Sequence, residues 1–114
     1  MLAGRYDITI EAGATFTLSL TYVDDTGAPV DLTGYTARMQ LRAAIGDTTP
    51  VIELSTSNGR ISIDTASGQI TLNISATDTG SLTGSGVYDL ELVNGVTVER
   101  LIEGLYTVNA EVTR

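Results

Sequence analysis

Strict alternation of apolar and polar side chains is the feature that most constrains this chain. Residues 15–23, TFTLSLTYV, carry an apolar side chain at every second position, with Thr or Ser between them. The same period of two recurs in residues 5–11, RYDITIE, and in residues 35–42, YTARMQLR. Successive side chains of a strand point to opposite faces, so this period is typical of strands with one buried face. We therefore expect a chain built mainly of half-buried strands.

The alternation gives each expected strand an inward and an outward face. Arg38 and Arg42 fall on the outward face of the strand at residues 35–42. A chain of 114 residues is long enough for one hydrophobic core, which the inward faces would supply. The side chains expected to point inward are Tyr6, Ile8, Ile10, Phe16, Leu18, Leu20, Tyr22, Tyr35, Ala37, Met39 and Leu41.

The rest of the chain continues the strand pattern. Eighteen Thr favour strands over helices, and twelve Gly supply turns. Residues 76–86 are the one place where a helical turn is expected. The sequence predicts an all-β fold, with residues 1–114 forming a single Ig-like antiparallel β-sandwich of about eight or nine short strands. The further strands are expected at residues 51–55, 60–64, 69–75, 87–93, 96–103 and 105–113.

A hairpin is expected at residues 94–95, because Asn-Gly is a strong signal for a two-residue turn between strands. Such a turn would place Asp89 opposite Arg100, and Tyr88 opposite Leu101. Both pairs are favourable between neighbouring strands. The expected register thus puts one ion pair and one apolar pair between the last strands.

Leu101 and Ile102 are consecutive apolar residues in an alternating strand. Either one of them faces outward, or a β-bulge buries both. In the first case an exposed Leu101 beside Tyr88 would form a contact patch. Tyr88 has a second interpretation, because Asp78, Gly80 and Tyr88 match part of the immunoglobulin corner pattern with a longer spacing. Under that interpretation Tyr88 is a core or corner residue.

The absence of His, Cys and Lys excludes most catalytic groups. Ser-His-Asp and Cys-His nucleophiles, Schiff-base lysines, disulfides and thiolate metal sites all need one of these residues. A carboxylate pair for glycoside hydrolysis stays open. One Phe, five Tyr and no Trp, however, give little surface on which a sugar could stack. We expect no enzymatic activity and no cofactor.

The charge balance bears on partners. A formal net charge of −8 opposes binding to nucleic-acid phosphates, which requires clustered positive charge. A less favoured alternative is that this acidity mimics nucleic acid and occupies another protein's DNA site. All six cations are Arg, the cation preferred at protein interfaces. Residues 1–13 carry no apolar run behind a basic flank, and we expect no membrane segment and a soluble protein made in a cytosol.

Two acidic turns are candidates for calcium, since hard cations bind oxygen ligands. One contains Asp24 and Asp25 with Asp31 downstream, and the other covers residues 64–68. Neither has the ordered spacing of an EF-hand loop. We favour the interpretation that these carboxylates cap turns by accepting backbone hydrogen bonds, and we expect no metal site.

The strand edges have no obvious protection. Proteins usually blunt exposed edges with Lys, Pro or bulges. This chain has no Lys, and Pro29 and Pro50 both fall in expected loops. The edges should therefore be covered by the chain's own loops or used by a partner.

The chain contains a G-x-P-x-D-L-T-G turn at residues 27–34, Arg38 in the strand that follows, and Y-D-L-x-L at residues 88–92. These motifs resemble the N-terminal domain of bacteriophage baseplate upper proteins. The family's closing G-x-x-x-V and V-T-R patterns match residues 104–108 and 112–114. The resemblance spans nearly the whole chain and rests on turn and core residues.

The resemblance implies a non-enzymatic structural component of a tailed-phage virion, in the tail, baseplate or neck. Such a protein would dock onto other virion proteins near receptor-binding appendages, as a homo-oligomer in a symmetric ring. A baseplate upper protein continues into a stalk beyond this point, which favours a connector here. Alternatives are a capsid decoration protein, or a module binding host-surface carbohydrate or a receptor through loops 43–50 and 76–86. The expected interface residues are Arg38, Arg42, Tyr88 and Leu101.

Overall fold

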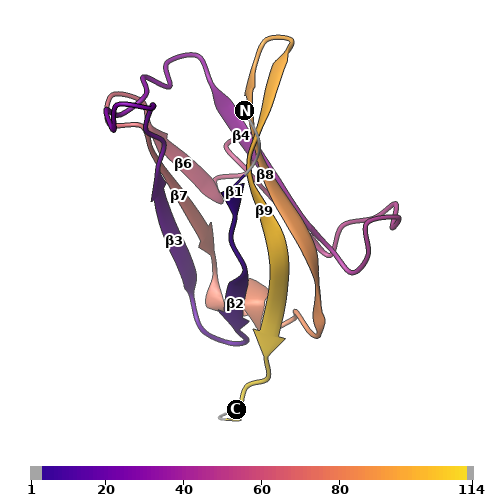
Figure 1. Ribbon diagram of the computed structural model, residues 1–114. Coiled ribbons are helices and arrows are strands. Elements are labelled where there is room, and N and C mark those ends of the chain that lie inside the picture. The colour runs from indigo at the N-terminus through magenta and orange to yellow at the C-terminus, as the bar shows by residue number, and fades with distance from the viewer. Residues whose placement is uncertain (1–3, 113–114) are drawn as a thin grey trace.

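The strands form two sheets that pack face to face (Figure 1). The structure is a computed structural model that describes residues 4–112. The larger sheet has the strand order β1-β9-β8-β4-β5, with β2 also paired to β9, and the smaller sheet has the order β3-β7-β6. The strands are β1 (Gly4–Arg5), β2 (Ile8–Glu11), β3 (Phe16–Thr21), β4 (Thr36–Arg42), β5 (Ile52–Ser55), β6 (Ile61–Asp64), β7 (Gln69–Ile74), β8 (Ser85–Asn94) and β9 (Thr97–Asn109).

The predicted all-β sandwich of the immunoglobulin type is confirmed. The larger sheet holds β4 and β5 together with the last two strands, β8 and β9. An additional strand at this edge, here β5, is a feature of variable-type immunoglobulin domains. One feature differs from the prediction of a wholly antiparallel sandwich: β1 and β2 run parallel to β9. The first and last strands of the described chain are therefore neighbours.

The core lies between the sheets and follows the alternation. The predicted inward side chains of β2 and β4 are buried, and those of β3, with Tyr22 and Tyr35, are half-buried against the core. Tyr6 is the exception, because 47% of it is exposed. The fully buried side chains include Ile10, Leu32, Met39, Leu41, Leu54, Ile70, Leu72, Ile74, Leu90, Leu92 and Tyr106.

The prediction of two separate strands at 96–103 and 105–113 is wrong, because β9 runs unbroken from Thr97 to Asn109. Residue 113 lies outside the described residues. Gly104 lies within β9, where the link between β1 and β2 crosses it. A Cβ atom at Gly104 would lie 2.8 Å from the carboxylate of Asp7 and closer still to the Tyr6 carbonyl oxygen. The glycine marks a close backbone approach instead of a strand end.

Tyr88 lies at the same crossing and is a core residue, 4% exposed. Its hydroxyl donates a hydrogen bond to the Tyr6 carbonyl. Tyr6 presents its backbone to the interior here, which explains why its side chain points out. Burial raises the pKa of Tyr88 to about 12, and the nearby Asp7 carboxylate acts in the same direction. The core interpretation of Tyr88 is confirmed, and an exposed patch of Tyr88 and Leu101 is wrong.

The predicted register of the last hairpin is also wrong. Asn94 pairs with Thr97, so the two-residue loop is Gly95–Val96 and not Asn94–Gly95. A shift in register follows at Leu101, which has no residue opposite it. The alternative of a bulge is confirmed, and both Leu101 and Ile102 are half-buried against the core.

The expected helical turn is present as α1 (Ala76–Thr79). Ser75 caps it, accepting a hydrogen bond of 3.2 Å from the Asp78 amide. The buried Thr79 hydroxyl accepts from the Gly13 amide at 3.1 Å and donates to the Ala14 carbonyl at 2.8 Å. Loop 76–86 is thus tied to the turn between β2 and β3. No helix within residues 4–112 is long and apolar enough to cross a membrane.

Candidate interaction surfaces

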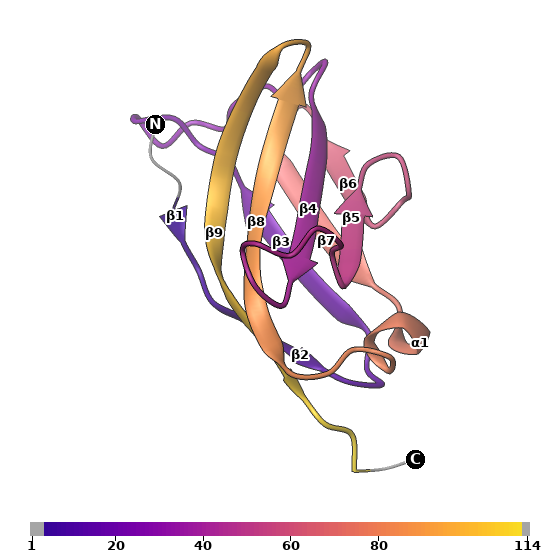
Figure 2. The same ribbon diagram turned by 90° about the vertical axis from the view of Figure 1, so that its right-hand side faces the viewer.

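Many charged side chains lie on the outer face of the larger sheet. Figure 2 looks onto this face, with β9, β8, β4 and β5 side by side. We call it the charged face. Its polar side chains are Arg38, Gln40, Arg42, Glu53, Asp89, Glu91, Arg100 and Glu103.

Two ion pairs cross neighbouring strands on the charged face. The Arg38 Nε atom lies 2.8 Å from Glu91 Oε1, and Arg100 Nε lies 3.3 Å from Asp89 Oδ2. Asp89 and Arg100 were expected to pair directly, and they do form an ion pair. They reach each other diagonally, however, because the bulge sets Asp89 opposite Glu103. Arg38 points outward as predicted.

Arg42 also points outward, and its partners are local. Its guanidinium donates to the Gln40 side-chain oxygen and to the Asp47 carbonyl, and the Gln40 amide in turn donates to Glu53. Arg42 therefore fastens loop 43–50 to β4. The structure thus brings Arg38 and Arg42 together on one face, while Leu101 lies elsewhere.

A shallow depression of about 440 Å³ lies on this face between loop 43–50 and strands β8 and β9. Arg42, Asp89 and Arg100 line its polar part. Its apolar border includes Ile45, which is 85% exposed, and Leu105, which is 46% exposed. In Figure 1 loop 43–50 projects away from this face at the right. The depression is open, with charges in the middle and apolar side chains at one end.

Charges of both signs lie close together on the charged face. Burial raises the pKa of the Asp89 carboxyl, and the neighbouring Glu91 adds to the effect. Arg100 acts in the opposite direction. Within residues 4–112, no cluster of three or more acidic side chains could hold a metal ion. The face offers fixed charges of both signs.

The first of the two acidic turns weighed for calcium, with Asp24 and Asp31, is a capped turn. Asp24 Oδ1 accepts hydrogen bonds from the Thr26 amide at 2.9 Å and from the Ala28 amide at 3.1 Å. Asp31 Oδ1 accepts from the Thr33 amide at 2.9 Å. Hydrogen bonds from the Thr26 and Thr33 hydroxyls, and after them these backbone bonds, lower the pKa of the Asp24 and Asp31 carboxyls. The interpretation as turn caps is confirmed for Asp24 and Asp31.

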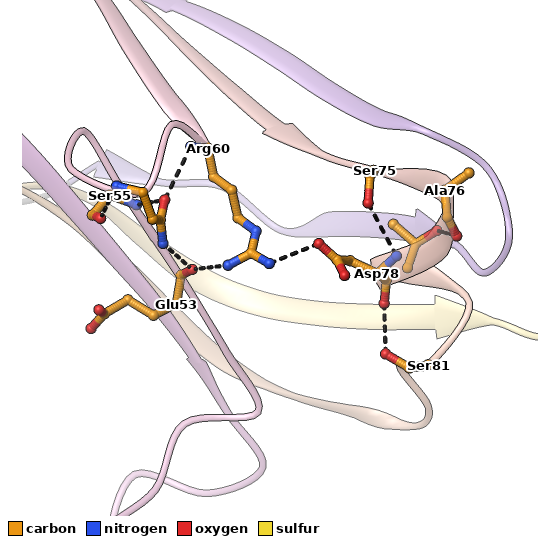
Figure 3. A network of polar contacts seen from close by, with 9 residues as sticks. Glu53, Ser55, Arg60, Ser75, Ala76, Asp78 and Ser81 are labelled. Atoms are coloured by element: carbon orange, nitrogen blue, oxygen red, sulfur yellow. Dashed lines mark hydrogen bonds and ion pairs between the residues drawn. The ribbon is translucent and has the colours of Figure 1, made fainter.

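Strand β5 forms one edge of the larger sheet, and its own loop covers it (Figure 3). The Glu53 carbonyl accepts from Asn58 Nδ2 at 2.9 Å and from Arg60 Nη1 at 3.0 Å, and the Ser55 amide donates to Asn58 Oδ1 at 3.0 Å. Arg60 Nη2 also donates to Asp78 Oδ2 at 2.7 Å, within α1. We call this the closed edge. Sequence reasoning singled out neither Asn58 nor Arg60.

Strand β3 forms an edge of the smaller sheet and pairs with β7 alone among the strands of residues 4–112. The Tyr22 amide donates to the Gly68 carbonyl at 2.9 Å, so the even-numbered residues of β3 bond to β7. The amides and carbonyls of Thr17, Ser19 and Thr21 therefore point away from the sheet. We call this the open edge.

Two hollows lie beside the open edge. One, of about 460 Å³, lies between β2 and β3 and is lined partly by Phe16 and Leu18. The other, of about 340 Å³, lies at the far end of β3 and is lined partly by Leu20, Leu101 and Ile102. Leu101, expected at an interface, thus borders the open edge and not the charged face.

The comparisons with known proteins bear on the fold. No protein-family model matches the chain, and no curated protein matches it. A solved structure from a study of multimeric cell-adhesive interactions of VGSC beta subunits is 13% identical with a TM-score of 0.52, over 94% of this chain and 93% of that one. A chain from a complex of ICOS with ICOS-L and an anti-ICOS-L VNAR domain is 14% identical with a TM-score of 0.54. That match covers 93% of this chain and 55% of the other.

Identities this low concern the fold alone. Together with the strand order, they place the chain among immunoglobulin-like β-sandwiches. Function has to be argued from the surfaces described above.

Proposed function

We propose that this protein is a non-enzymatic structural component of a tailed-phage virion, in the tail, baseplate or neck. It acts by assembling with other virion proteins through the charged face. The resemblance to baseplate upper proteins supports the phage setting. In the structure its motifs form turns and core strands: residues 27–34 make the turn that Asp31 caps, and residues 88–92 lie in β8.

One observation carries the choice of the charged face: its long side chains are already held in place. The ion pairs of Arg38 with Glu91 and of Arg100 with Asp89 fix four flexible side chains across three strands. Fixing such side chains before binding lowers the entropic cost of forming an interface. A fixed pattern of both charges also orients a partner and rejects mismatched ones.

The border of the charged face supplies apolar contact. Val87 and Leu105 are opposite each other on β8 and β9, and Ile45 stands beside them on loop 43–50. Stable interfaces combine apolar contact with a polar, hydrogen-bonded part. A partner that covers both regions would bury Ile45 and Leu105 and meet complementary charges on β4 and β8.

The experiment asks whether the protein is part of the particle and whether the charged face puts it there. Purified phage particles are analysed by mass spectrometry, and tagged protein is then tested for incorporation into particles that lack the native copy. The double variant Arg38→Glu/Glu91→Arg keeps the ion pair and the net charge but reverses the pattern. We expect normal folding and at least a tenfold loss of incorporation, about 1.4 kcal/mol.

Absence of the protein from purified particles would contradict the virion proposal. Normal incorporation of the reversed variant would contradict the role of the charged face. Detection in tail fractions or in capsid fractions separates a tail, baseplate or neck component from a capsid decoration protein.

A second candidate function is favoured by the depression on the same face. Arg42, Asp89 and Arg100 could bind the hydroxyl groups of a host-surface carbohydrate there. Tyr88, the one aromatic residue lining the depression, is buried and cannot stack on a sugar. A glycan array with purified protein tests this candidate, and a hit abolished by Arg42→Ala would support it.

A further inference from the structure

The open edge is suited to pairing with another strand. Three successive outward-pointing backbone units, at Thr17, Ser19 and Thr21, present both donors and acceptors along β3. An unpaired edge of this kind is a template for strand addition unless it is blocked. The closed edge shows how this fold blocks one, because Asn58 and Arg60 occupy the backbone groups of β5. The sequence of β3 contains no Lys, Pro or charged residue that could do the same.

The charge distribution favours a second copy of this chain as the strand that pairs there. Copies with a net charge of −8 repel one another wherever acidic side chains meet. The outward side chains of β3 and its neighbour β7 are all uncharged: Thr17, Ser19, Thr21, Gln69, Thr71 and Asn73. On this outer face two copies can therefore approach along β3 without bringing like charges together, while Asp7 and Glu11 line the hollow on the inner side.

Strand β3 is also complementary to itself. Antiparallel pairing across a two-fold axis at Ser19 sets Ser19 of one copy opposite Ser19 of the other, and Thr17 opposite Thr21. These are the residues whose backbone groups point outward, so each such pair can exchange both of its hydrogen bonds. Thr and Ser side chains opposite one another are favourable neighbours on the outer face.

The inner face of the same pairing is apolar. The register places Leu18 of one copy beside Leu20 of the other, and both residues are half-buried in the single chain. These leucines border the two hollows that flank the open edge. Pairing would cover them and remove apolar surface from water.

We propose that two copies of this protein associate through their β3 strands, forming one continuous six-stranded sheet across a two-fold axis. This contact deepens the proposed function, because it rests on the proposal that the protein acts by assembly and supplies the contact between copies. A contact limited to one strand and its flanks is small, so the association is of the weak, reversible class. The paired β3 strands themselves contribute no charged residue.

The test uses the purified full chain alone, so its outcome is independent of whether the protein is found in particles. Sedimentation equilibrium over a range of concentrations should show a reversible monomer–dimer equilibrium. Ser19→Lys places two ammonium groups at the axis, and Ser19→Pro removes the central donors. Each should weaken dimerisation about tenfold or more. Ser62→Lys is the matched control, since Ser62 is an exposed serine on the opposite edge strand of the same sheet.

Two further readouts identify the contact. Hydrogen exchange should show protection of the Thr17, Ser19 and Thr21 amides that grows with concentration, while Leu18 and Leu20 are protected at any concentration. Raising the salt from about 0.05 to about 0.5 M should leave dimerisation unchanged or strengthen it, because salt screens the repulsion between acidic copies.

A protein that stays monomeric at all concentrations would overturn the proposal. So would a dimer that Ser62→Lys breaks and Ser19→Lys does not, because it would form through β6. Dimerisation that weakens with salt would equally overturn it, since that behaviour indicates pairing through the charged face. Circular dichroism shows whether each variant is folded.

Discussion

Two edge strands of the sandwich, β5 and β3, are built in opposite ways. At the closed edge, Asn58 and Arg60 hydrogen-bond the backbone of β5, and Arg60 also bonds Asp78 within α1. At the open edge, β3 presents its outward backbone groups beside apolar hollows, and β1 and β2 stand next to it without pairing with it. The loop after β5 thus covers the edge of that strand, and no such side chains cover the edge of β3 within the described residues.

This difference teaches that edge protection does not require Lys or Pro. A single Asn in a tight loop satisfies both a carbonyl and an amide of its neighbouring strand, and an Arg adds a second donor. Such side chains replace a missing strand, because they offer the same hydrogen-bonding groups. The open edge lacks these substitutes and is available for a partner.

The largest effect is expected where β1 and β2 are anchored beside the open edge. Gly104→Ala would place a Cβ atom 2.8 Å from the Asp7 carboxylate and closer still to the Tyr6 carbonyl. The backbone would have to move, and we expect a loss of roughly 3 kcal/mol or more in the free energy of unfolding. Urea denaturation measures it. Gly46→Ala is the control, because a Cβ atom there meets nothing within 4 Å. Equal stability of the two variants would contradict the close approach.

Tyr88 anchors the same crossing and gives it a pH dependence. Its pKa is raised from 10.0 to about 12, so the hydroxyl ionises earlier in the unfolded chain than in the folded one. The resulting stabilisation, roughly 2 to 3 kcal/mol, is present below pH 10 and is lost as the pH rises toward 12. The stability difference between wild type and Tyr88→Phe should shrink over that range. A difference that does not change with pH would disprove this account.

Removing Asn58 should turn the closed edge into an open one. Asn58→Ala leaves the Glu53 carbonyl and the Ser55 amide with fewer partners, at a cost of about 1 to 2 kcal/mol in unfolding free energy. The freed edge should also add a concentration-dependent association, measurable by light scattering. Asn73→Ala, at an exposed position on β7, is the control. If Asn58→Ala neither destabilised the protein nor changed its association, the protective role of Asn58 would be refuted.

The smallest effect on folding is expected on the charged face. Arg38→Gln removes a cross-strand ion pair whose Arg side chain is about half exposed. Exposed pairs contribute little, so the change should stay below about 1 kcal/mol and diminish with added salt. Thermal denaturation at low and high salt measures it. A large, salt-independent loss would mean that Arg38 supports the fold and not an interface.

The alternation was sufficient to predict which side chains of β2 and β4 are buried. Ile8, Met39 and Leu41 are buried because a period of two fixes which face a side chain occupies. The prediction that Tyr6 points inward was wrong. The Tyr6 carbonyl, and not its side chain, faces the interior and accepts a hydrogen bond from Tyr88. Gly104 was predicted to separate two strands, because the sequence does not reveal which backbone segment lies close to a glycine.

Long-range pairing was beyond the sequence. The sequence left open whether Leu101 forms a bulge or one of the two apolar residues faces outward. A bulge shifts the pairing by one residue, so the register of the last hairpin could not be predicted. The parallel pairing of β1 and β2 with β9 joins residues almost a whole chain apart. Of the residues on the charged face, Arg38 and Arg42 were correctly predicted to point outward from the alternation alone. Asn58 carried no signal, because nothing in its loop shows which backbone groups it reaches.

The parallel pairing of the first and last strands has a mechanical consequence. Figure 1 shows β2 and β9 descending side by side, with the N-terminal end of the described chain at the top and the C-terminal end at the bottom. Opposed tension on Gly4 and Asn109 would slide these strands along each other. Many hydrogen bonds between the strands would then be strained at once, instead of breaking one after another. The sandwich is therefore built to resist stretching between its two ends.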